Sequence, residues 1–182
     1  SKGAGTALAF VIFFSLFIRF LPRWETALAV IAACTMTLGN VVAIGQQNIK
    51  RFMAFSSISQ AGYLFLGFLG GSTDGVAAMV FYLLAYAVSN IAVFSVIIFY
   101  ENSSGRKEIK DYAGLSSLNP LVSLAMMVSL FSLAGIPPLS GFAGKFFLFS
   151  IASKSGFHWL VALAALNSTI SLYYYPRLIR QM

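Results

Sequence analysis

Lys145 is the residue of this chain best suited to ion chemistry, because it lies inside a long apolar stretch. The sequence from Leu121 to Ile151 carries no other charge. An ammonium group at membrane depth costs at least ~2.5 kcal/mol, so it usually faces a bundle interior or a water path. The alternative is a lysine near a helix end that extends to the membrane surface. The position of Lys145 far from the ends of the apolar stretch favours a lysine that faces the bundle interior or a water path. Lys145 is therefore predicted to be part of an ion pathway.

A group of helix-breaking residues precedes this lysine in the sequence: Gly135, Pro137, Pro138 and Gly141. Proline has no backbone N–H and clashes with the preceding turn, so two consecutive prolines should interrupt a helix. Membrane proteins tolerate the freed carbonyl groups only against protein or a wet cavity. We therefore expect a helix break between Ala134 and Gly141, directly before Lys145.

Two apolar segments carry hydroxyl and amide side chains that have the chemistry to line a water path. They are Ser56, Ser57, Ser59 and Gln60 in one segment, and Tyr82, Tyr86, Ser89 and Asn90 in the next. Such groups inside membrane spans also serve as hydrogen bonds between helices, worth roughly 0.6 kcal/mol each. The sequence favours neither reading over the other.

Composition places these residues in a membrane protein. The chain is 59% hydrophobic with a mean hydropathy of +0.84, and only 9% of its residues are charged, against about 25% in soluble domains. The net charge of +7 arises from short loops and forms no stripe, which argues against nucleic-acid binding. Cys34 is the single cysteine, so neither a disulfide framework nor a thiolate metal site is expected.

A membrane span needs roughly 20 apolar residues. By this criterion the sequence predicts six membrane-spanning helices. They are Gly3 to Phe20, Trp24 to Ile44, Phe52 to Leu69, Val76 to Tyr100, Pro120 to Ile151, and Phe157 to Ile179. The fifth is about ten residues longer than a straight span, and the predicted break lies near its middle. We expect an all-α polytopic membrane protein with one membrane domain over residues 1–182 and a discontinuous fifth helix.

The basic residues predict the orientation of these spans. Seven of them fall in loops on one predicted side: Lys50, Arg51, Arg106, Lys107, Lys110, Arg177 and Arg180. Three fall on the other: Arg19, Arg23 and Lys154. Because cytoplasmic loops carry the excess of lysine and arginine, both ends of the chain are predicted to be cytoplasmic.

The sequence carries no signature of a cofactor site. No glycine-rich phosphate loop follows a strand, no His/Cys cluster has metal-ligand spacing, and no nucleophile has a nearby base. We therefore expect no cofactor and no metal to be bound by this chain, and any redox chemistry to belong to partner subunits.

Several longer runs resemble one family. They are Thr35–Asn40, Gln47–Tyr63, Asp111–Leu115, Leu133–Phe147 and Tyr173–Tyr175. Together they are similar to the antiporter-like membrane subunits of proton-pumping NADH:quinone oxidoreductase, respiratory complex I, and within that family to the branch of subunit N. The resemblance covers nearly the whole chain.

The resemblance implies a parent protein of about fourteen helices, built from two inverted five-helix repeats that each contain one broken helix. The chain would be its C-terminal part, from the eighth helix through the thirteenth, which is the second half of the inverted-repeat fold. Lys145 matches the terminal lysine of the family's proton path, and Lys2 matches the central lysine of the eighth helix. Some relatives carry histidine where this chain has Gln60. Glutamine cannot be protonated near neutral pH, so transfer from Lys2 to Lys145 would run through water.

The same resemblance implies a function and two alternatives. The chain would belong to a proton-translocating NADH:quinone oxidoreductase of a bacterial inner membrane, moving protons through lysines and water. NADH, FMN, iron–sulfur clusters and quinone would be bound by partner subunits, and the chain's own partners would be other complex I membrane subunits, the lipid bilayer and protons. The alternatives are a subunit of a multisubunit cation/proton antiporter, which shares these lysines, and a non-conducting structural segment.

Overall fold

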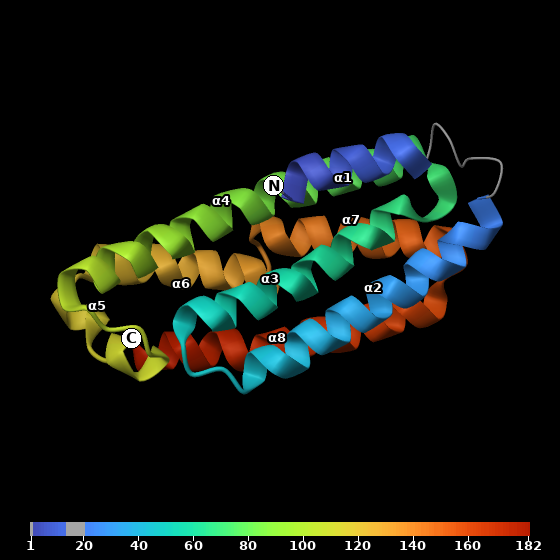
Figure 1. Cartoon of the computed structure of the whole chain (residues 1–182). Helices are drawn as coiled ribbons and strands as arrows, with labels where there is room; N and C mark the ends of the chain where they lie inside the picture. Colours follow the sequence, from blue (N-terminus) through green and yellow to red (C-terminus); the bar gives the residue numbers. More distant parts are fainter. Residues whose placement is uncertain (1, 14–20) are drawn as a thin grey trace.

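The fold is a bundle of helices that run along one common direction (Figure 1). It is given by a computed structural model that describes residues 2–13 and 21–182. The elements are α1 Lys2–Val11, α2 Leu21–Ile44, α3 Ile49–Phe65, η3 Leu66–Gly71, α4 Thr73–Ser104, η4 Ile109–Tyr112, α5 Leu115–Leu118, α6 Pro120–Ala134, α7 Ser140–Lys154 and α8 His158–Gln181. The two η elements are 3-10 helices. The chain is all-helical in these ranges, as the sequence predicted.

Neighbouring helices bury their small and aromatic residues against each other and leave apolar residues on the outside. Helix α2 packs on α3 and α8, and α4 packs on α6 and α7. Helices α6 and α7 follow one another end to end in Figure 1. Large apolar residues point outward from α4, among them Leu84, Val88 and Ile91, which are 61%, 71% and 67% exposed. An apolar outer face of this kind is typical of a membrane or protein contact surface.

Three helical segments in the described ranges are long and apolar enough to cross a membrane: Trp24–Ile44, Ile49–Leu69 and Thr73–Ser104. Pro120–Ala134 is apolar but shorter. The sequence predicted six spans. Helices α6 and α7 do not qualify singly because each has 15 residues, and residues 14–20 of the predicted first span lie outside the described residues. The six-span arrangement therefore stays a prediction.

Several helix boundaries differ from the predicted ones because polar residues join the helices. Helix α3 begins at Ile49, not at Phe52, since Asn48 caps it. The Asn48 side chain accepts hydrogen bonds from the backbone N–H groups of Lys50 (3.0 Å) and Arg51 (3.2 Å). An asparagine at this position satisfies donors that a helix start leaves open. The charged pair thus lies inside the first turn and not in a loop.

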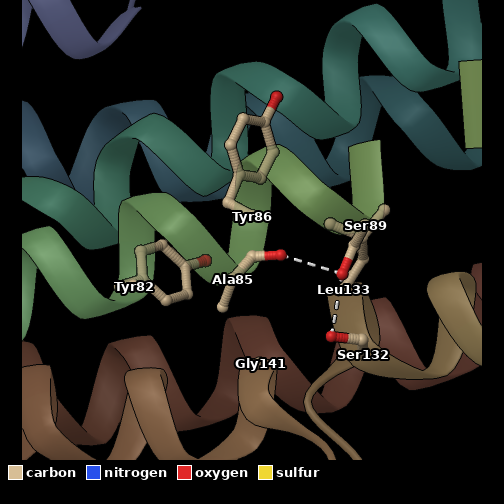
Figure 2. A pocket seen from close by; sticks show the side chains of 7 residues that line it. All are labelled: Tyr82, Ala85, Tyr86, Ser89, Ser132, Leu133 and Gly141. Atoms are coloured by element: carbon tan, nitrogen blue, oxygen red, sulfur yellow. Dashed lines mark hydrogen bonds between the residues drawn. The ribbon is translucent and has the colours of Figure 1, made fainter. Parts of the chain in front are cut away.

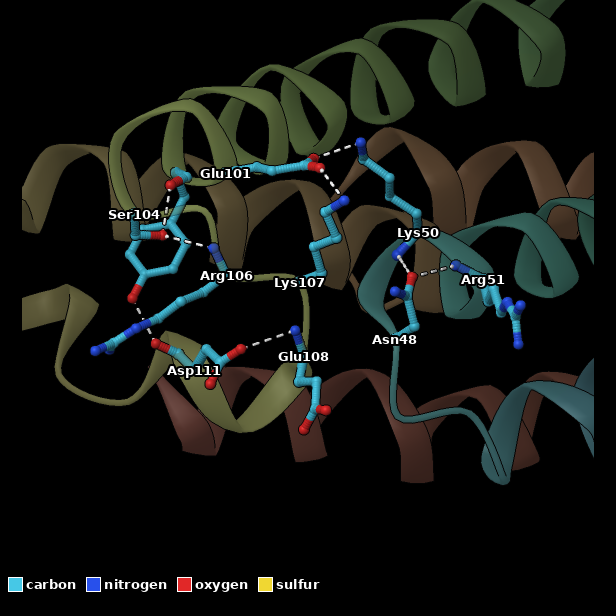
Figure 3. A network of polar contacts seen from close by, with 10 residues as sticks. Asn48, Lys50, Arg51, Glu101, Ser104, Arg106, Lys107, Glu108 and Asp111 are labelled. Atoms are coloured by element: carbon cyan, nitrogen blue, oxygen red, sulfur yellow. Dashed lines mark hydrogen bonds and ion pairs between the residues drawn. The ribbon is translucent and has the colours of Figure 1, made fainter.

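Lys50, Arg51, Arg106 and Lys107, four of the basic residues predicted to share one side, lie in one polar network (Figure 3). Glu101, near the end of α4, forms ion pairs with Lys50 of α3 and with Lys107, the latter at 3.4 Å. Lys110 pairs with Glu108 at 2.7 Å, and this hydrogen bond raises the pKa of Lys110. These contacts hold the loop after α4 against the start of α3. We refer to this region as the basic end.

Candidate functional site

Two separate helices flank the residues at which the sequence predicted a break. Helix α6 ends at Ala134, and α7 begins at Ser140. Gly135 closes α6 with φ 87°, a left-handed conformation that favours glycine. Pro137 and Pro138 follow, and neither has an N–H group to donate to the last carbonyls of α6. Those carbonyls are therefore open to another donor.

Lys145 supplies that donor. Its ammonium Nζ lies 3.0 Å from the carbonyl oxygens of both Leu133 and Ala134, and 3.4 Å from the Ser168 hydroxyl. The side chain is 3% exposed. Tyr63 covers it, with Nζ 4.8 Å from the ring centroid. The end of a helix carries partial negative charge, and an aromatic face attracts a cation. In its protonated form, Lys145 is held here by two backbone carbonyls, one hydroxyl and an aromatic ring.

Among the residues that the structure describes, no carboxylate pairs with Lys145. The ion pairs among the described residues involve Glu101 and Glu108 at the basic end, and all acidic residues of the chain lie outside the lysine's hydrogen-bond shell. Within the described residues, no three His, Cys, Asp or Glu side chains gather as metal ligands. Dipoles that stabilise a cation without a fixed counter-charge suit a group that has to release its proton as well as hold it.

Gln60 of α3 forms hydrogen bonds with residues of three other helices near the break. Its amide nitrogen donates to the Leu133 carbonyl (3.0 Å), which also accepts from the lysine, and to the Tyr175 hydroxyl (3.2 Å). Its amide oxygen accepts a hydrogen bond from the Tyr82 hydroxyl. Tyr175 in turn hydrogen-bonds Ser56. A continuous buried network therefore runs from α3 through α8 and α4 to the end of α6.

A small cavity lies beside the break (Figure 2). It is lined by Tyr82, Ala85, Tyr86, Ser89, Ser132, Leu133 and Gly141 and measures about 10 Å³. That is the volume at which a single water molecule begins to fit. Within it, the Ser89 hydroxyl donates to the Ala85 carbonyl or to the Ser132 hydroxyl, each at 2.9 Å. The cavity lies between α4 and the end of α6, next to this pair of bonded hydroxyls.

The other predicted lining residues are less closely involved. Ser59 is buried, whereas Asn90 is only partly buried. Ser57 donates to the Ala54 carbonyl of its own helix at 2.9 Å. Gly141, predicted as part of the break, is the second residue of α7. It is needed there for close approach, since a Cβ atom on it would lie 1.8 Å from the Ser132 carbonyl oxygen.

Lys2 begins α1, but its side chain lies outside the described residues. The next residue, Gly3, faces Leu83 of α4. Tyr82, adjacent to Leu83, contacts Gly144 of α7. The start of α1 and the helix that carries Lys145, α7, therefore contact neighbouring residues of α4.

The sequence reading missed the polar face of α8. The hydroxyls of Ser168 and Ser171 lie 3.5 Å and 3.3 Å from the Ala134 carbonyl. Asn167, the residue before Ser168, accepts from the Asn40 amide through its backbone carbonyl oxygen at 3.0 Å and its side-chain oxygen at 2.9 Å. Their recurrence every three to four residues in an apolar helix was the available signal, since that spacing places side chains on one face.

Comparison with known proteins identifies the family. The profile described as "NADH:quinone oxidoreductase/Mrp antiporter, TM" matches residues 4–171. The chain belongs to this family. It is 44% identical to NADH-quinone oxidoreductase subunit N of Phocaeicola vulgatus over all of this chain and 39% of that protein. It is 42% identical to NAD(P)H-quinone oxidoreductase subunit 2 of a Nostoc species over all of this chain and 35% of that protein. The chain thus spans less than two fifths of these relatives.

Solved structures agree. The chain aligns with a chain of the Mrp complex from Dietzia at a TM-score of 0.88 and 29% identity, covering 97% of this chain and 33% of that one. It aligns with a chain of respiratory complex I from Thermus thermophilus with bound NADH at 0.84 and 27% identity, covering 97% and 39%. The resemblance inferred from the sequence motifs is confirmed, and the fold is that of antiporter-like, multi-pass membrane subunits.

Proposed function

We propose that this chain is the lysine-bearing half of a proton-translocating membrane subunit, with Lys145 as a proton carrier. Electron transfer to quinone in partner subunits would drive it. The observation that carries the proposal is the ammonium of Lys145 at a broken helix. It is buried, bound to two backbone carbonyls and one hydroxyl, and has no carboxylate partner.

The chemistry follows from what each state of the lysine can bind. The ammonium has three N–H donors, and the two carbonyls of α6 with the Ser168 hydroxyl accept all three. A neutral amine gains a lone pair and weakens these contacts, so Ser168, which can donate, becomes its partner. A charge placed nearby by a neighbouring subunit would shift the balance between the two states. Lys2 is the proposed donor from the other side.

We also propose how the helices cross the membrane. Helices α6 and α7 have 15 residues each and are therefore about 22 Å long, too short for a hydrocarbon core of about 30 Å. Joined end to end they form one discontinuous span. With the segments before and after, this makes six spans, and the basic end lies in the cytoplasm of a bacterium. NADH, FMN, iron–sulfur clusters and quinone belong to partner subunits in this proposal.

A cation/proton antiporter subunit is the second candidate, favoured by the TM-score of 0.88 to a chain of the Mrp complex. Sodium-driven proton movement in membrane vesicles, in the absence of NADH and quinone, separates the two. Exchange of sodium for protons would support the antiporter. Proton movement only during quinone reduction supports the first proposal, and no dependence on Lys145 in either assay would leave a structural role.

The experiment is substitution of Lys145 in the complete complex, measured in inverted membrane vesicles. Lys145→Ala is expected to abolish proton pumping by this subunit and to slow NADH:quinone turnover, while electron transfer from NADH to an artificial acceptor continues. Lys145→Arg is expected to be nearly as damaging, since a guanidinium keeps its proton. Exposed Lys110→Ala is the matched control. Wild-type pumping by the arginine variant would mean that the residue supplies fixed charge only.

A further inference from the structure

A groove lies between the start of α4 and the end of α7, away from the basic end and from Lys145. Residues that line it include Asp74, Ala77 and Phe81 of α4 and Phe147, Ser150 and Lys154 of α7, and its volume is about 440 Å³. The two helices contact closely at Gly144 and Tyr82, and the groove lies beyond that contact, toward the bundle end. A volume of this size is in the range of small-molecule and lipid sites, about 300 to 1,000 Å³.

Opposite charges flank the outer end of the groove. Asp74 lies in the first turn of α4 and Lys154 in the last turn of α7. Both are exposed, and neither forms an ion pair with a residue whose side chain the structure describes. Helix dipoles favour an acid and a base at these two positions. The result is one carboxylate and one ammonium that face the same opening without pairing to each other.

The inner part of the groove is aromatic. Phe81 and Phe147 meet edge to face, with ring centroids 5.6 Å apart, and are 40% and 46% exposed. Asp74 and Phe81 are seven residues apart on one helix, which is about 10 Å along its axis. The hydrocarbon core is about 30 Å thick. With Asp74 at the polar boundary of the membrane, the groove would reach about 10 Å into the hydrocarbon.

We propose that this groove binds one phosphatidylethanolamine molecule. Its primary ammonium donates to the Asp74 carboxylate, its phosphate accepts from Lys154, and one acyl chain lies against Phe81 and Phe147. A headgroup with a phosphate alone would leave the carboxylate unpaired, and a choline headgroup has no N–H to donate.

The test uses the intact complex reconstituted into nanodiscs that contain phosphatidylethanolamine with a photoreactive group on its acyl chain. After illumination, labelled peptides are mapped by mass spectrometry. We expect labelling of the segments around Phe81 and Phe147. Asp74→Asn and Lys154→Gln should each lower it about threefold, and the double variant about tenfold. Glu108→Gln and Lys110→Gln, at the basic end, are the matched controls and should leave labelling unchanged.

Competition decides the headgroup. Excess unlabelled phosphatidylethanolamine should reduce labelling, whereas excess phosphatidylcholine should not. Equal competition by both lipids, or equal labelling of the double variant and the wild type, would overturn the assignment. So would an absence of lipid label together with a cross-link from the groove to a neighbouring subunit. The outcome is independent of proton transfer at Lys145, because neither charge belongs to that site.

Discussion

Gly141→Ala tests whether the close contact between α6 and α7 holds the lysine site in place. A Cβ at this position would lie 1.8 Å from the Ser132 carbonyl oxygen and 2.6 Å from its carbon. Ordinary contacts begin at about 3.4 Å, so the first turn of α7 has to move by about 1.5 Å. Lys145 lies one turn further along the same helix, and its bonds to the carbonyls of α6 measure 3.0 Å. A shift of that size takes them beyond hydrogen-bond length.

Two opposing terms set the magnitude for Gly141→Ala. Alanine is favoured over glycine inside a helix by about 1 kcal/mol. Overpacking a tight core costs about 1 to 3 kcal/mol, and the upper value applies because the clash is with backbone and not with a flexible side chain. The clash therefore wins, and we expect the subunit to be destabilised by about 2 kcal/mol and proton pumping to fall strongly.

The assay compares thermal stability and proton pumping of the intact complex carrying Gly141→Ala or Gly5→Ala. Gly5 is also helical, but a Cβ on it would meet nothing within 4 Å. The Gly5 variant should therefore keep wild-type pumping and lose no stability. If Gly141→Ala also pumps and melts like the wild type, the contact between α6 and α7 does not position Lys145, and the argument from the helix break fails.

Two further predictions concern side chains around the lysine. Tyr63→Leu should reduce proton pumping at alkaline pH more than at acidic pH, because the ammonium form of Lys145 loses an aromatic partner worth about 0.5 to 2 kcal/mol. Tyr63→Phe keeps the ring and should behave as wild type. Equal pumping by the two variants across the pH range would contradict a role of the ring in stabilising the ammonium. Gln60→Leu should lower the melting temperature of the complex, because the buried Tyr82 hydroxyl loses its acceptor at a cost of about 1 to 3 kcal/mol. Gln46→Leu, which removes only a bond to the Val42 carbonyl within its own helix, is the control, and an equal effect would refute the role of Gln60.

The sequence predicted the break and the buried lysine because both depend on local chemistry. Two consecutive prolines interrupt a helix. A single charged side chain in an apolar run usually faces the protein interior or a water path. Composition and the apolar runs predicted the all-helical class, and the resemblance of the longer motifs predicted the family. The apolar runs placed helix ends less well, since Asn48 and Gly105 cap their helices beyond them. A prediction based on the length of apolar runs does not detect a capping residue.

The partners of the lysine were harder to predict because they come from distant parts of the chain. Ser168 and Tyr63 reach Lys145 from α8 and α3, and no local pattern links these segments. The hydroxyls of α8 were visible in the sequence only as polar residues within an apolar helix. Which of them faces the break depends on how α8 packs on α6, and that is set by tertiary contacts.

Gln60 shows why the position of a polar residue does not define its part in a proton path. The sequence offered two interpretations of Gln60, a lining residue of a water path or a hydrogen bond between helices. In the structure both donor directions of the amide are taken, by the Leu133 carbonyl and by Tyr175, and its oxygen accepts from Tyr82. The amide can donate to a water molecule only by releasing one of these bonds. Gln60 therefore holds the Leu133 carbonyl, one of the two that bind Lys145. A proton that reaches Lys145 through water is expected to use a group other than this amide.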